Sequence, residues 1–269
     1  MNGVAQMFLD YASPESFVTR LGWTPDKWQK DLIKSESQRI IEVCGRQIGK
    51  STVTGVKAYR KAKTIPNSLV LLISLSHRQS LLLFGKVVEA VKKDPDHIAI
   101  VEKINLQELV LTNGSRIVAA PGKDETIRGF SGVDLLVIDE AAYVPDKLYD
   151  AVAPMIAASQ GQVILLSSPA GKDGFFWRIW DKGEGWERYR IQAKDCGRIS
   201  QKFLDEQRLI VPDHVYRREY EAEFTESIYS LVTAEDLEAM MQNSVRPLIS
   251  DSFVVQEDDP LPRVEALIG

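Results

Sequence analysis

Short apolar runs of strand length recur along the chain, and stretches with helical spacing lie between them. The apolar runs are Ile40–Cys44, Leu69–Leu75, Leu135–Ile138 and Val163–Leu166. Mostly apolar runs of this length fit strands that are covered on both faces of a sheet. The stretches that look helical are Ser51–Lys63, Arg78–Lys93, Pro145–Ala158 and Phe175–Asp181. Because buried strands alternate with helices, the pattern predicts an α/β fold with a mainly parallel, doubly wound sheet.

Two other stretches predict strands of a different kind. Glu108–Ala119 consists of two strand-like runs around Asn113–Gly114, a dipeptide typical of hairpins with a type I′ turn. Trp186–Ile191 alternates polar and apolar residues, which is typical of a more exposed strand.

The sequence changes character from about Ser227 onward. Ala234–Gln242 predicts a short helix, and the acidic, proline-containing stretch Ser250–Pro262 is typical of a linker. The last residues, VEALIG, look like the beginning of a strand. We therefore expect a large α/β domain followed by a smaller and less regular C-terminal segment.

Composition and charge exclude several classes of protein. The 269 residues suffice for one large α/β domain, with or without a small appendage. No apolar run approaches the roughly 20 residues of a membrane span, and the N-terminus has no secretory pattern. Two cysteines make neither a disulfide framework nor a zinc cluster, which favours a reducing cytoplasm. The net charge, 33 − 38 = −5, is unlike that of a strong DNA binder, although a basic patch or a ring of subunits could still hold DNA.

The segment CGRQIGKS at Cys44–Ser51 carries the clearest chemistry. It follows the phosphate-loop pattern G-x-x-x-x-G-K-[ST], with cysteine in place of the first glycine. Gly49 lets amides turn toward phosphate oxygens, Lys50 brings a positive charge to the β- and γ-phosphates, and Ser51 offers a hydroxyl to Mg²⁺. Cys44 is tolerable at a strand end if its φ stays negative. The residues expected to bind the nucleotide here are Gly45, Arg46, Gln47, Gly49, Lys50, Ser51 and Thr52.

Two acids follow the apolar run Leu135–Ile138. A buried parallel strand would deliver Asp139 to the carboxyl edge of the sheet beside the phosphate loop, where it can hold Mg²⁺ through water. Glu140 is then placed to orient or deprotonate an attacking water. Two solvated acids at a strand end are the simple alternative, but the phosphate loop upstream favours a site for ATP hydrolysis.

Two further segments supply weaker candidates. The strand Val163–Leu166 leads into Ser167, Ser168 and Pro169, and the hydroxyls could sense a γ-phosphate; an ordinary strand with a turn is the alternative. In the G-x-x-P-x-x-x-Q segment Gly22–Gln29, the Gln29 amide can pair with adenine beside Trp28. A core position for Trp28 and a surface position for Gln29 are equally open.

Two arginines compete for one role in hydrolysis. Arg128 stands in a polar stretch before the strand of Asp139 and could reach the γ-phosphate of a neighbouring subunit. Arg46, inside the phosphate loop, could supply the same charge within one chain. An arginine of this kind contributes about 10³–10⁵-fold to the rate in other NTPases, whereas a surface arginine contributes nothing.

Taken together, these motifs resemble the ATPase domain of the large terminase subunit of tailed bacteriophages. The resemblance spans about Phe17–Asp181 and is carried by CGRQIGKS, Gly22–Gln29, Thr126–Phe130, LLVIDEAAYV at Leu135–Val144 and LLSSPAG at Leu165–Gly171. It implies an ASCE-type P-loop NTPase with a small C-terminal lid subdomain that uses ATP and Mg²⁺. It also implies that Lys50, Ser51, Asp139 and Glu140 serve hydrolysis, that Ser167–Pro169 couple it to movement, and that Arg128 acts in trans or Arg46 in cis.

The same resemblance implies a setting for the molecule. The partners would be double-stranded DNA, a homo-oligomeric ring (a pentamer), a portal protein and a small terminase subunit, with no membrane, in the cytoplasm of an infected bacterium. Residues 1–225 would form the ATPase domain with lid elements, 226–262 a lid or linker segment, and 263–269 the truncated start of a nuclease domain. No nuclease activity is expected, because the acid cluster for two metals is absent.

Other classes of protein share some of these motifs. A helicase-like or restriction-type DNA translocase needs a second RecA-like domain, and no domain of that size fits after Asp181. A nucleotide-binding switch without turnover does not need Glu140. An ATPase that is not a motor would differ in whether DNA or the portal changes its turnover.

Overall fold

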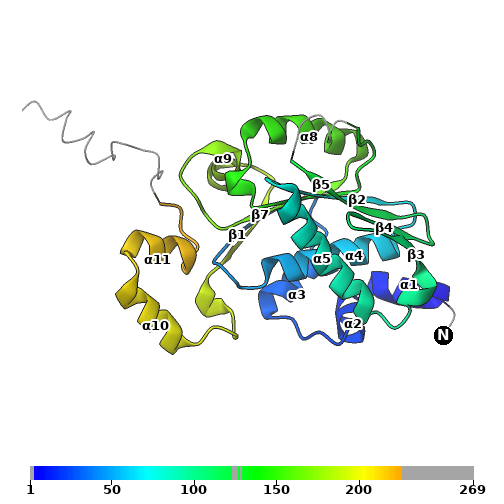
Figure 1. Cartoon of the computed structure of the whole chain (residues 1–269), viewed down its shortest axis with the longest axis horizontal. Coiled ribbons are helices and arrows are strands. Elements are labelled where there is room, and N and C mark those ends of the chain that lie inside the picture. The colour runs from blue at the N-terminus through cyan, green and yellow to red at the C-terminus, as the bar shows by residue number, and fades with distance from the viewer. Residues whose placement is uncertain (1–2, 123–126, 128, 226–269) are drawn as a thin grey trace, which may run out of the picture. The chain divides into compact units, whose positions relative to one another are not determined.

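The computed structural model describes residues 3–122, 127 and 129–225. Their centre is an eight-stranded sheet in the order β3-β4-β5-β2-β6-β7-β1-β8 (Figure 1). The parallel strands are β1 Arg39–Cys44, β2 Leu69–Ser74, β5 Arg116–Pro121, β6 Leu135–Asp139, β7 Gln162–Ser167 and β8 Glu187–Ile191. The strands β3 Val101–Ile104 and β4 Glu108–Leu111 extend one edge in antiparallel fashion. The expected α/β fold with a mainly parallel sheet is confirmed.

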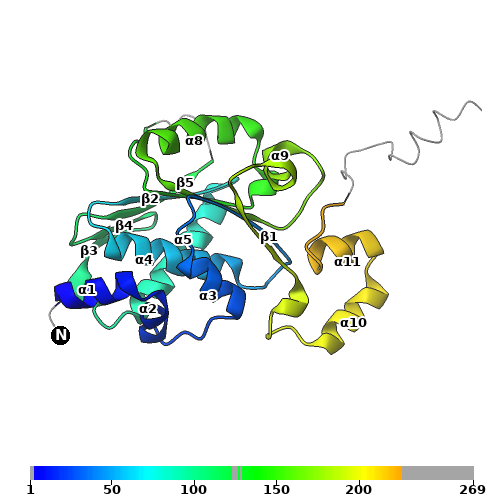
Figure 2. The same ribbon diagram turned by 180° about the vertical axis from the view of Figure 1, so that it is seen from behind.

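Helices cover both faces of the sheet (Figures 1 and 2). One face carries α1 Gly3–Ala12, α2 Pro14–Arg20, α3 Lys27–Lys34, α4 Lys50–Thr64, α5 His77–Lys93 and the short α6 His97–Ile100. The other face carries α8 Asp146–Ser159 and α9 Gly174–Lys182, and α10 Gln201–Ile210 and α11 Asp213–Glu219 follow β8. Alternation along β1 explains the two layers, because Ile40 packs into one core cluster and Ile41 into the other.

The hairpin predicted around Asn113–Gly114 is present, but its turn is not of type I′. That type needs a positive φ at both central residues, whereas Gly114 has φ 83° and Asn113 is not in that region. The Asn113 side chain instead binds the neighbouring helix, because its amide donates to the carbonyls of Ala62 and Lys63 at 2.9 and 3.1 Å. Asn113 therefore satisfies carbonyl groups in the last turn of α4, and the turn adapts to this packing.

Several elements were not predicted. These are the short helices α1–α3, α6, α10 and α11, and β3, whose side chains are mostly exposed. The helix predicted at Ala234–Gln242, the linker at Ser250–Pro262 and the segments 226–262 and 263–269 lie outside the described residues. No helix in the described part of the chain is long and apolar enough to cross a bilayer.

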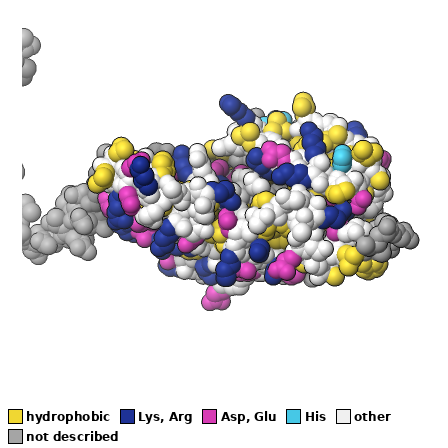
Figure 3. All heavy atoms as spheres, turned by 90° about the horizontal axis from the view of Figure 1, so that it is seen from below, with side chains coloured by type: hydrophobic (Ala, Val, Ile, Leu, Met, Phe, Trp, Pro, Cys, Tyr) yellow, Lys and Arg dark blue, Asp and Glu magenta, His cyan; other side chains and the backbone are white. Residues whose placement is uncertain are grey.

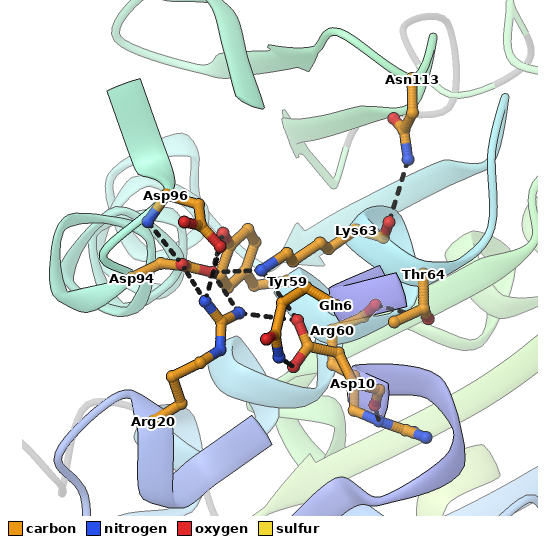
Figure 4. Close-up of polar contacts among 10 residues, drawn as sticks. All are labelled: Gln6, Asp10, Arg20, Tyr59, Arg60, Lys63, Thr64, Asp94, Asp96 and Asn113. Carbon is orange, nitrogen blue, oxygen red and sulfur yellow. Dashed lines mark hydrogen bonds and ion pairs between the residues drawn. The ribbon is translucent and has the colours of Figure 1, made fainter. Parts of the chain in front are cut away.

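A buried group of charges joins the N-terminal helices to the far end of α4 (Figure 4). Arg20 on α2 lies 2.6 Å from a carboxylate oxygen of Asp10 and 2.8 Å from one of Asp94, and both acids are fully buried. Lys63 on α4 pairs with the same two acids at 2.8 and 2.7 Å, and the Tyr59 hydroxyl donates to Asp94 at 2.8 Å. This Asp10–Asp94 cluster holds α1 and α2 against the helix that begins in the phosphate loop.

Candidate active site

The predicted phosphate loop connects β1 to α4. Cys44 is the last residue of β1, is fully buried and keeps a negative φ, so cysteine fits in place of glycine. Gly49 has φ 91°, in the region that favours glycine, and Gln47 has φ 58°. Helix α4 begins at Lys50, so its unpaired N-terminal N–H groups lie at the loop, as in anion-binding sites.

The first two amides of the loop are bound by other parts of the chain. Gly45 donates its N–H to the Ile191 carbonyl at 2.9 Å, and Arg46 donates to the Glu219 carbonyl at 2.8 Å. A Cβ atom at Gly45 would lie 3.1 Å from the Glu219 carbonyl oxygen, so glycine allows this close approach. The anchoring leaves the later amides of the loop for an anion.

Three residues predicted from separate motifs meet at the carboxyl edge of the sheet. Lys50 Nζ lies 2.7 Å from Glu140 Oε1, and the Ser167 hydroxyl donates to Glu140 Oε2 at 3.4 Å. Glu140 follows β6 with φ 52°, a left-handed conformation that is strained for a side chain of this kind and is common at functional sites. The strained backbone turns the Glu140 carboxylate toward the phosphate loop.

Asp139 lies at the end of β6 and is buried, with 7% of its surface exposed. Burial raises its pKa to about 6, and the charge of Glu140 adds to this, while Lys50 and a hydrogen bond with Ser51 act in the opposite direction. Burial alone would lower the pKa of Lys50, but the charges of Glu140 and Asp139 outweigh it and the pKa is raised. A cation bound beside Ser51 would keep the Asp139 carboxylate ionised, so the pair suits Mg²⁺.

A cavity of about 580 Å³ opens beside these groups and is lined by Lys50, Glu140, Ser168, Gln79 and Tyr143 among others. Gln79 and Tyr143 were not predicted from the sequence. The signal for Gln79 is a capping box with Ser76 at the start of α5, directly after the carboxyl end of β2. The buried Ser168 and Pro169 follow β7 at the same edge of the sheet.

Side chains from the segment after β8 also contact the loop, and they were not predicted either. Arg46 forms an ion pair with Glu219 at the end of α11. Arg198 donates to the Ile48 carbonyl at 2.7 Å and lies 3.2 Å from the Asp26 carboxylate. No local motif marks Glu219 or Arg198. The competing candidate Arg128 lies outside the described residues.

The predicted adenine-binding pair lies against the loop but is largely enclosed. Gln29 is 1% exposed; its Oε1 accepts from the Asp26 amide at 2.9 Å, and its Nε2 lies 3.0 Å from where a Cβ atom on Gly49 would be. Trp28 packs against buried residues of two core clusters. Gln29 is therefore not a surface residue, whereas Trp28 is half-buried at the edge of these clusters, and the adenine-binding role of the pair stays a prediction.

Comparisons with known proteins agree with this geometry. Residues 42–239 match the family "Terminase large subunit, T4likevirus-type, N-terminal". The terminase large subunit of Thermus phage G20c is 26% identical over 83% of this chain and 53% of its own length. The probable terminase large subunit of Enterobacteria phage P7 is also 26% identical, over 58% of this chain and 34% of its own. The chain spans about half the length of the first of these relatives.

Solved structures share the fold. The large terminase ATPase domain of Thermus phage P74-26 superposes with a TM-score of 0.70 and 23% identity, covering 78% of this chain and 98% of that one. The large terminase of a thermophilic bacteriophage, solved in complex with ADP, gives a TM-score of 0.63 and 14% identity, covering 75% and 54%. With the matched family model covering most of the sequence, the chain belongs to the terminase large subunit family and corresponds to its N-terminal part.

Proposed function

We propose that this chain is the ATPase motor of a viral DNA-packaging terminase. With Mg²⁺ it hydrolyses ATP and uses the energy to move double-stranded DNA into a procapsid in the cytoplasm of the infected bacterium. The observation that carries the proposal is the contact between Lys50 and Glu140 at 2.7 Å, beside the buried Asp139. A nucleotide-binding switch would not need a strained acid in this place.

Each residue of the candidate site has a separate role in the proposed hydrolysis. Lys50 and the amides at the start of α4 would hold the β- and γ-phosphates, which displaces Lys50 from Glu140. Glu140 would then be free to orient and deprotonate the attacking water, while Ser167 holds its second oxygen. Ser51 and Asp139 would hold Mg²⁺, which neutralises charge on the phosphates. Ser167, Ser168 and Pro169 would report the state of the γ-phosphate to the rest of the domain.

Replacing Lys50 with alanine should weaken nucleotide binding by about 10- to 100-fold, the range for losing one charge-assisted hydrogen-bonding group. Calorimetric titration with ADP and Mg²⁺ measures the change. Lys86→Ala is a matched control, because Lys86 is a partly exposed lysine on α5 whose ammonium group pairs with the exposed Glu89. Unchanged affinity in Lys50→Ala would remove the phosphate loop from the proposal.

The arginine that completes the site can be assigned by the dependence of turnover on protein concentration. If Arg128 acts on a neighbouring subunit, ATP turnover per chain rises with concentration, and Arg128→Ala abolishes the rise. Arg46→Ala, which also breaks the ion pair with Glu219, serves as the comparison. A rate per chain that is flat and insensitive to Arg128 would assign hydrolysis to one chain and to Arg46.

DNA binding is proposed for the assembly and not for a single chain. Basic and acidic side chains are interspersed on the face shown in Figure 3, and the net charge of −5 opposes binding to phosphate backbones. A ring of subunits, docked on a portal protein and supplied with DNA by a small terminase subunit, would gather local basic groups around one duplex. Stimulation of ATP turnover by DNA or portal protein separates this motor from a general ATPase.

A further inference from the structure

Glu42 is a buried carboxyl in the middle of β1, three residues before Gly45 of the phosphate loop. It has no exposed surface, and neither carboxyl oxygen has a hydrogen-bond partner among the described residues. Its neighbours in register are Leu166 on β7 and Tyr189 on β8. Burying a carboxylate without a partner is costly, so a sequence that keeps one beneath its functional loop calls for an explanation.

The surrounding charges do not neutralise Glu42. The charged groups that act on Glu42 are Lys50 and Lys57 from α4 and Asp139 from β6. The titratable side chains nearby are Cys44 on β1 and Tyr189 on β8. Lys57 is occupied elsewhere, since its Nζ donates to the carbonyls of Leu32 and Ser35 at 3.0 and 2.5 Å, at the end of α3. Burial raises the pKa of Glu42 to about 8, and burial lowers the pKa of Lys57 to about 8.

We propose that Glu42 takes up a proton when the phosphate loop binds a nucleotide. The inference rests on the proposed function, because it needs a polyanion on the loop. Three strand residues span roughly 10 Å, so an ionised Glu42 would lie near the phosphates across a poorly solvated core. Mg²⁺ offsets only part of the charge of ADP, so the bound nucleotide stays a net anion and repels an ionised Glu42. Lys50 already pairs with Glu140 in the free protein, so its transfer to the phosphates adds no positive charge near Glu42. The added negative charge therefore favours the protonated form of Glu42 in the complex.

Nucleotide affinity then depends on pH with a definite sign. Below pH 8 Glu42 is already protonated in the free protein, so nucleotide binding takes up no proton. Above pH 8 Glu42 is ionised in the free protein, so binding must be accompanied by proton uptake. The affinity for nucleotide therefore falls as pH rises. With a pKa of about 8 in the free protein and a fully protonated complex, the dissociation constant for ADP rises about tenfold between pH 7 and pH 9. A merely structural Glu42 would leave the affinity independent of pH in this range.

The test is calorimetry of Mg²⁺ and ADP binding to the full chain at pH 8 in two buffers with different ionisation enthalpies. Wild type should show an apparent enthalpy that differs between the buffers in the direction of proton uptake, of about half a proton per site. Glu42→Gln, which keeps the shape and cannot ionise, should abolish the difference and flatten the pH profile. Glu42→Met is the second variant, if glutamine in the core prevents folding.

The outcomes separate the two proposals. Equal apparent enthalpies for wild type in both buffers would overturn the role of Glu42 and leave the ATPase proposal intact. Proton uptake that persists in Glu42→Gln or Glu42→Met would assign it to another group, with Lys57 the first candidate, and would also overturn the role of Glu42. If the chain binds no nucleotide in either buffer, or if Lys50→Ala binds as well as wild type, the proposed function itself fails.

Discussion

Replacing Glu140 with glutamine should lower the rate of ATP hydrolysis by about 10²–10⁴-fold while ATP still binds, because the substitution removes the proposed general base and keeps its shape. In the free protein Glu140 also pairs with Lys50 at 2.7 Å. The substitution breaks that pair and leaves Lys50 available to the phosphates, so the affinity for ATP should stay constant or increase. Steady-state hydrolysis and equilibrium binding of ATP, measured side by side, check both halves of this expectation.

A matched control for this experiment is Glu89→Gln. Glu89 is an exposed acid on α5 that contacts Lys86, and it should change neither rate nor affinity. Loss of hydrolysis and binding to the same degree in Glu140→Gln would contradict a role as base, and would instead make Glu140 a residue that holds the site together.

The second large effect concerns stability. Asp94→Asn should lower the free energy of unfolding by about 3–5 kcal/mol, because it leaves Arg20 and Lys63 sharing Asp10 as their buried partner. That is a large part of the roughly 5–15 kcal/mol by which domains are stable, so the variant should unfold at much lower urea concentration. Equilibrium unfolding of both proteins in urea, followed by circular dichroism, measures the difference.

Asp96→Asn is the control for the Asp10–Asp94 cluster. Asp96 contacts the same arginine at 2.9 Å, but half of its side chain is exposed, so the cost should be within about 1 kcal/mol. A cost as small for Asp94→Asn as for Asp96→Asn would show that burial of the cluster adds no stability.

The difference in stability between wild type and Asp94→Asn should depend on pH with a definite sign. Burial alone would raise the pKa of Asp94, but hydrogen bonds from Lys63, the Asp96 amide and Tyr59 outweigh it and the pKa is lowered. A carboxyl with a lowered pKa stabilises the fold above its ordinary pKa of 3.8 and loses that contribution as pH falls further. The difference between wild type and Asp94→Asn should therefore persist at pH 7 and shrink below pH 3.8.

The central sheet was predictable because its strands are buried on both faces. The runs in β2, β6 and β7 consist almost entirely of apolar residues, so a pattern of hydrophobicity is enough to find them. The short helix α2 carries no comparable signal. Helix α2 is held by tertiary contacts, with Phe17 in the core and Arg20 in the Asp10–Asp94 cluster, and these contacts are not visible in its seven residues.

The same distinction applies to the candidate site. The placement of Lys50, Asp139 and Glu140 at one edge of the sheet could be predicted, because parallel strands bring their carboxyl ends to the same edge. The contacts of Arg46 with Glu219 and of Arg198 with the loop could not be predicted, since they depend on the path of the chain after β8. Glu42 could have been singled out, because it is the one charged residue of a run predicted to be covered on both faces. That its carboxyl oxygens lack a hydrogen-bond partner is visible only in the structure.

The position of β1 in the sheet also sets the order in which the site can appear during synthesis. Its neighbours are β7 and β8, and Arg39 pairs with Val163, made 163 − 39 = 124 residues later. Ile40 pairs with Glu187, made 187 − 40 = 147 residues later. At 5–20 residues per second, β1 is made roughly 6 to 30 s before these partner strands. The nascent chain therefore makes the strand that leads into the proposed nucleotide site early, and that site is complete only near the end of translation of this domain.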